Sequence, residues 1–101
     1  MPYIPKDQRE RINGEIAALI QAIKALGKEN RDGALNYSIT TMIRNLYEMK
    51  YIEQNAAMGV LSCIEKEHYR TQIGPYEDIK IKENGDATDI QTIGELNGKS
   101  Y

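Results

Sequence analysis

Glu65 and His68 form the first pair of potential metal ligands, because their spacing places a carboxylate and an imidazole on one helix face. The Glu-x-x-His pattern occurs in di-iron helical bundles, where further carboxylates and usually a second such motif complete the site. The second predicted helix offers only Glu48, at its far end. We therefore interpret the pair as a charged, solvated face with an interface histidine, and expect no metal and no cofactor.

A nucleophilic centre is not expected either. His68 is the only histidine, and Cys63 lies five residues away, off its helix face. A nucleophile needs an adjacent base and an orienting group, whereas Cys63 stands next to apolar residues that predict a buried, inert thiol. No glycine-rich phosphate loop is present. We expect no catalytic residue and no enzymatic activity.

Arg and Tyr residues give a more informative pattern. Asn36, Tyr37 and Arg44 fall on the second predicted helix, and Tyr69, Arg70 and Tyr76 fall near the end of the third. Arg offers a planar donor fork for phosphate or carboxylate, and Tyr offers a ring and a hydroxyl. The two sets together predict a site for a small anionic ligand such as a nucleotide.

The same residues allow a structural interpretation. Acidic Glu77 and Asp78 follow Arg70 closely along the chain. Arg44 and Arg70 could pair with these carboxylates and tie the tail onto the helices. Both readings stay open at this stage.

Three amphipathic segments must position these residues. Apolar residues recur every three or four positions over about 5–26, 32–48 and 52–73, which predicts three helices. Gly27 suits a left-handed stop, Asn30 or Asp32 suits a cap for the second helix, and Pro75 predicts the end of the third. Because the first linker is short, we expect an all-α fold with a small antiparallel three-helix core.

The segment after Gly74 is ambiguous. Its order of Pro and acids first, then bases and Gly, predicts a short fourth helix. The alternation over 79–82 before Asn84-Gly85 fits a hairpin as well, and we favour the helix. We expect one helical domain over 1–86 and a loose, polar C-terminal extension over 87–101.

Composition narrows the partners and the compartment. The net charge is −2, with 13 basic and 15 acidic residues and no basic cluster, so we expect no nucleic acid partner. A single cysteine and the lack of an apolar leader or membrane-spanning run predict a cytoplasmic protein without a membrane partner. Seven Tyr and the small pair Ala57 and Gly59 predict a homo-oligomer.

A series of short motifs resembles a family of short uncharacterised proteins from tailed phages, prophages and bacteria. The likeness covers residues 1 to 86. It is carried by Met1-Pro2-Tyr3-Ile4-Pro5, Arg31-Asp32-Gly33-Ala34-Leu35-Asn36-Tyr37, Gly59-Val60-Leu61, Tyr69-Arg70, Pro75-Tyr76-Glu77-Asp78 and Glu83-Asn84-Gly85-Asp86. The resemblance implies a phage or mobile-element setting in a bacterial host cell, and brings no established chemistry.

These observations together predict a phage-type accessory protein that acts stoichiometrically. Its expected role is to bind and sequester a small anionic ligand, such as a nucleotide signal of host immunity. The alternatives are an inhibitor that binds a host enzyme through the same Tyr and Arg residues, and a structural phage component.

Overall fold

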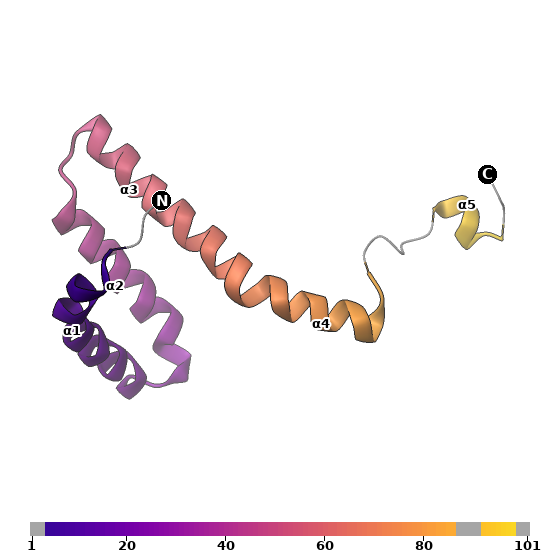
Figure 1. Cartoon of the computed structure of the whole chain (residues 1–101), viewed down its shortest axis with the longest axis horizontal. Helices are drawn as coiled ribbons and strands as arrows, with labels where there is room; N and C mark the ends of the chain where they lie inside the picture. The colour runs from indigo at the N-terminus through magenta and orange to yellow at the C-terminus, as the bar shows by residue number, and fades with distance from the viewer. Residues whose placement is uncertain (1–3, 87–91, 99–101) are drawn as a thin grey trace. The chain divides into compact units, whose positions relative to one another are not determined.

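The computed structural model describes residues 4–86 and 92–98, and the regular secondary structure among them is helical, with no strand. The all-α prediction is therefore confirmed. The elements are α1 (Lys6–Ala25), a 3₁₀ turn (Lys28–Asn30), α2 (Arg31–Leu46), α3 (Tyr51–His68), a π-helical turn (Tyr69–Ile73, the π-turn below), α4 (Gly74–Asn84) and α5 (Ile93–Leu96) (Figure 1).

The chain divides into two compact units, Met1–Val60 and Leu61–Tyr101. The first unit holds α1 and α2, which contact each other, and the first part of α3. The second holds the rest of α3, the π-turn, α4 and α5. The division of the chain into a domain over 1–86 and an extension stays a prediction.

The ends of α1 follow from its sequence. Pro5 precedes the helix, and its carbonyl accepts hydrogen bonds from the backbone N–H groups of Gln8 and Arg9 at 3.0 and 3.1 Å. Gly27 ends the helix with φ 92° and ψ 154°. This backbone conformation is essentially restricted to glycine, so the predicted glycine stop is confirmed.

The predicted cap of α2 is wrong. Asn30 does stand at the N-cap position, but its side chain makes no capping hydrogen bond. Its Nδ2 instead donates to the carbonyl of Leu26 at 2.8 Å, while Asp32 pairs with the neighbouring Arg31 at 3.0 Å. The 3₁₀ turn before α2 places the Asn30 amide next to the exposed carbonyls at the end of α1, and these carbonyls compete for it.

Pro75 does not end the helical backbone, contrary to the sequence prediction. Proline lacks an N–H and its ring crowds the carbonyl four residues earlier. The chain accommodates this by widening into the π-turn, where the N–H of Gly74 donates to the carbonyl of Tyr69, five residues back. Helical backbone then continues to Asn84, and Gly85 ends it with φ 92°. The fourth element is thus the favoured helix and not the hairpin.

Little of the described chain is buried. Only Ala57, at 3% exposure, and Gly94 are buried among residues 4–86 and 92–98. Ala57 is therefore already covered, which removes it as a close-approach surface for a second copy. The antiparallel three-helix core stays a prediction.

The C-terminal extension has more structure than expected. Thr92 Oγ1 accepts a hydrogen bond from the N–H of Glu95 at 3.1 Å, and the Glu95 carboxylate accepts one from the N–H of Thr92 at 3.3 Å. This capping box starts the short helix α5. Whether the extension is loosely held stays a prediction for residues 92–98, while 87–91 and 99–101 lie outside the described residues.

No helix in the described ranges is both long and apolar enough to cross a membrane.

Candidate functional site

Asn36 and Thr40 form a polar stripe on α2. Thr40 Oγ1 donates a hydrogen bond of 3.5 Å to Asn36 Oδ1, so side chains four residues apart share a face. Arg44 lies in the last turn, where the carbonyl end of the helix favours a cation. It forms no ion pair or side-chain hydrogen bond with the part of the chain that the structure describes. Its guanidinium can therefore accept an anionic partner.

Tyr37 lies in a different place, at an apolar groove of about 550 Å³ between α1 and α2. The groove is lined by Leu19, Ala22, Ile23, Leu26, Glu29, Asn30, Gly33, Ala34, Tyr37 and Ser38. The polar groups of Asn30 and Ser38 already donate to the carbonyls of Leu26 and Ala34, at 2.8 and 2.7 Å. The groove therefore suits apolar side chains better than a charged ligand.

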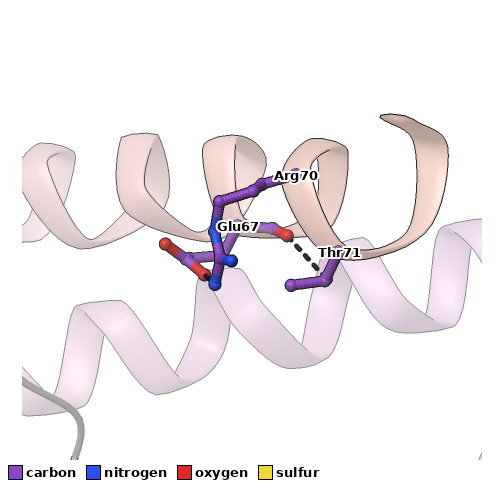
Figure 2. Close-up of polar contacts among 3 residues, drawn as sticks. All are labelled: Glu67, Arg70 and Thr71. Atoms are coloured by element: carbon purple, nitrogen blue, oxygen red, sulfur yellow. Dashed lines mark hydrogen bonds and ion pairs between the residues drawn. The ribbon is translucent and has the colours of Figure 1, made fainter. Parts of the chain in front are cut away.

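Arg70 on the second unit carries a charge that is already compensated. Its Nη2 lies 2.7 Å from Glu67 Oε2, and the Thr71 hydroxyl donates to the Glu67 carbonyl at 2.7 Å. Figure 2 shows these contacts, which join Glu67 in α3 to the π-turn. An anionic ligand at Arg70 would have to compete with the Glu67 carboxylate. This pair lies within neighbouring turns of the helical backbone, and the pairing of Arg70 with Glu77 or Asp78 that would tie the tail down stays a prediction.

Tyr69 is also engaged by an acid. Its hydroxyl donates to Glu77 Oε2 at 2.7 Å and so links the start of the π-turn to α4. This hydrogen bond and the charge of Glu77 raise the pKa of Tyr69, with smaller contributions from desolvation and from Asp78. The surroundings of Tyr69 are therefore acidic, which disfavours an anion there.

The π-turn also shapes a hollow of about 540 Å³ on the second unit. It is lined by Ile64, Glu65, Lys66, His68, Tyr69 and Ile73. Ile64 and Tyr69 are each 51% exposed, so the apolar part of the hollow faces solvent. Glu65 and His68 both line it, but no group of three or more His, Cys, Asp or Glu within residues 4–86 and 92–98 could hold a metal ion.

The six predicted site residues thus fall into two sets. Asn36, Tyr37 and Arg44 belong to the first unit, and Tyr69, Arg70 and Tyr76 to the second, where Lys80 Nζ lies 5.5 Å from the centre of the Tyr76 ring.

Sequence reasoning missed Glu67 as the partner of Arg70 and Glu77 as the partner of Tyr69. The available signal was Gly74-Pro75 within an otherwise helical pattern, since π-turns relieve such conflicts and often lie at functional sites.

Comparison with known families adds one finding. The family described as "Domain of unknown function (DUF6899)" matches residues 1–87. The chain belongs to this family. The match fits the expected family without assigned function, and α5 lies beyond the part that DUF6899 covers. No curated protein and no solved structure matches the chain.

Proposed function

We propose that this DUF6899 protein acts stoichiometrically by binding another protein, and that the hollow at the π-turn is the recognition surface. The proposal selects the inhibitor alternative from the sequence analysis. It rests on one observation: Ile64, Tyr69 and Ile73 present an exposed apolar hollow framed by charged residues on a helical segment. Exposed apolar patches with a polar rim are typical of protein interaction sites.

The energetics fit a partner's side chain better than a small anion. Fully burying an aliphatic side chain contributes about 1.5–3 kcal/mol. Ile64 is about half exposed, so covering the remainder would contribute roughly half of that amount. Tyr69 and Tyr76 supply aromatic anchors of the kind that dominate interface energies, and both are at least half exposed.

The hollow is also held in shape before any partner binds. The Tyr69–Glu77 hydrogen bond spans the π-turn, and the Arg70–Glu67 pair holds its first residues. Ordering these side chains on binding therefore costs less conformational entropy.

Site-specific photo-crosslinking in bacterial cells tests this proposal. A photoreactive phenylalanine replaces Lys66, an exposed residue that lines the hollow, in one variant and Tyr51 in the control, since Tyr51 is 84% exposed and belongs to the first unit. We expect one host polypeptide to crosslink from position 66, not from position 51, and to be lost when Ile73→Asp is added. Equal crosslinking from both positions, or none from position 66, would refute the proposal.

A small anionic ligand, such as a nucleotide immune signal, is the second candidate function. The observation in its favour is Arg44, whose guanidinium is uncompensated among the described residues and lies on the Asn36–Thr40 stripe. The protein is purified from infected cells and denatured, and released small molecules are identified by mass spectrometry. Arg31→Ala is the control, since the Arg31 side chain pairs with Asp32. A nucleotide that is lost from Arg44→Ala but kept by Arg31→Ala supports this function. A wild-type protein that releases no nucleotide rejects it.

The wider setting belongs to the same proposal. Both candidate functions fit an accessory protein of phage origin that works in the cytoplasm of a bacterial host. The motif resemblance supports this origin.

A further inference from the structure

We propose that the protein dimerises through α1, which pairs in parallel with α1 of a second copy as a short two-stranded coiled coil. This surface belongs to the first unit, whereas the hollow belongs to the second. The inference therefore goes beyond the proposed function, and either one can be wrong while the other is right.

The main evidence for this pairing is the spacing of the apolar residues along one face of α1. Ile12, Ile16, Leu19, Ile23 and Leu26 follow one another in steps of four, three, four and three. This spacing is the a/d pattern of a heptad repeat, with Ile16 and Ile23 at a and with Ile12, Leu19 and Leu26 at d. A β-branched residue at a combined with Leu at d favours parallel two-stranded pairing. The stripe therefore indicates a second copy of the same helix as its partner.

The structure leaves this stripe only partly covered, because Leu19, Ile23 and Leu26 share an open apolar groove with α2. All 20 residues of α1 lie outside the buried class. The side chains of Ile12, Ile16, Leu19 and Leu26 are 37–56% exposed, and only Ile23 is half-buried. Helices gain most of their stability by packing an amphipathic face. The exposed stripe of α1 therefore needs a partner surface.

The charges along α1 also suit a second copy. Every member of the stripe is apolar, so pairing desolvates no charge along the seam. The positions flanking the seam are Asn13 and Ile20 at e and Glu15 and Ala22 at g. In a parallel pair Glu15 of one copy faces Ile20 of the other, so no like charges face each other. In a parallel pair, the apolar groove that Leu19, Ile23 and Leu26 share with α2 lies at the same end in both copies.

Two neighbouring substitutions test the pairing in the full chain. Ile16→Asp places a carboxylate in the seam, and the control Ala17→Asp places the same group one residue later, at an exposed b position. We expect light scattering and sedimentation equilibrium to give a dimer for the wild type and for Ala17→Asp. Ile16→Asp should weaken dimerisation roughly tenfold or more. A monomeric wild type at micromolar concentration, or equal dimerisation of both variants, would overturn the proposal.

A second measurement tests the orientation and does not depend on whether Ile16→Asp folds. Leu26→Cys is introduced together with Cys63→Ser, so that position 26 carries the sole thiol. In a parallel coiled coil two d residues face each other across the seam. We expect mild oxidation to convert this variant to a covalent dimer, and a control with the thiol at Gly14, on the outer f position, to stay uncrosslinked. A dimer that does not crosslink through residue 26 would overturn the parallel seam.

Discussion

Replacing Gly27 with Ala should destabilise the first unit, and the backbone geometry gives the size of the effect. Gly27 has φ 92° and ψ 154°, a conformation that residues with a Cβ rarely adopt. Holding a non-glycine residue in such a region costs about 1–3 kcal/mol. A Cβ would also lie 2.6 Å from Glu29 Oε1, but this contact is cheap because the Glu29 carboxylate can move away. Backbone strain therefore dominates.

Gly14→Ala is the matched control. It is the same chemical change inside α1, where an added Cβ would meet nothing within 4 Å. Alanine is about 1 kcal/mol more favourable than glycine in a helix interior. We therefore expect opposite signs from one substitution at two positions that lie on and next to the same helix.

Thermal unfolding followed by circular dichroism measures both effects. For a domain of 60–100 residues, 1 kcal/mol corresponds to a change in Tm of about 4–8 °C. Gly27→Ala should lower Tm by at least this amount and Gly14→Ala should raise it. All samples are compared at one protein concentration, because self-association makes Tm concentration-dependent. A Gly27→Ala protein as stable as the wild type would refute the need for positive φ at this position.

Three further outcomes follow from the second unit. The pKa of Tyr69 is raised by the hydrogen bond to Glu77 and by its charge, so the stabilisation by Tyr69 is present below its ordinary pKa of about 10 and is lost as pH rises through the folded-state pKa. Glu77→Gln should lower this pKa in a ring-carbon NMR titration, and an unchanged titration would contradict the assignment. Gly74→Ala should weaken the π-turn, since a Cβ would lie 3.2 Å from the Tyr69 carbonyl oxygen. We expect faster hydrogen exchange of the amide of residue 74, and an unchanged rate would argue against a clash with this carbonyl. Thr92→Ala should cost about 0.5–2 kcal/mol of local helix stability, because it removes half of the capping box with Glu95. Cα chemical shifts measure the loss of helix, and shifts that keep their helical values would show that the cap is dispensable.

The sequence by itself determined the helices and most of their ends. The apolar period placed α1, α2 and α3 within one to five residues of their observed limits, because a helix repeats every 3.6 residues and its pattern is local. Gly27 likewise determined the end of α1, since a positive φ strongly favours glycine. The same local chemistry selected the residue types of the candidate site, namely Arg44, Tyr69 and Arg70.

Only the tertiary structure decided which groups these residues meet. Periodicity does not distinguish a helix that stops before Pro75 from one that widens into a π-turn, because both arrangements accommodate a residue that has no backbone N–H to donate. The π-turn in turn brings the Tyr69 hydroxyl to Glu77, eight residues away, and leaves Arg70 with Glu67. Hydrogen-bond partners depend on distances of a few tenths of an ångström, and the choice between an ion pair within the helix and a site for a ligand is made at that scale.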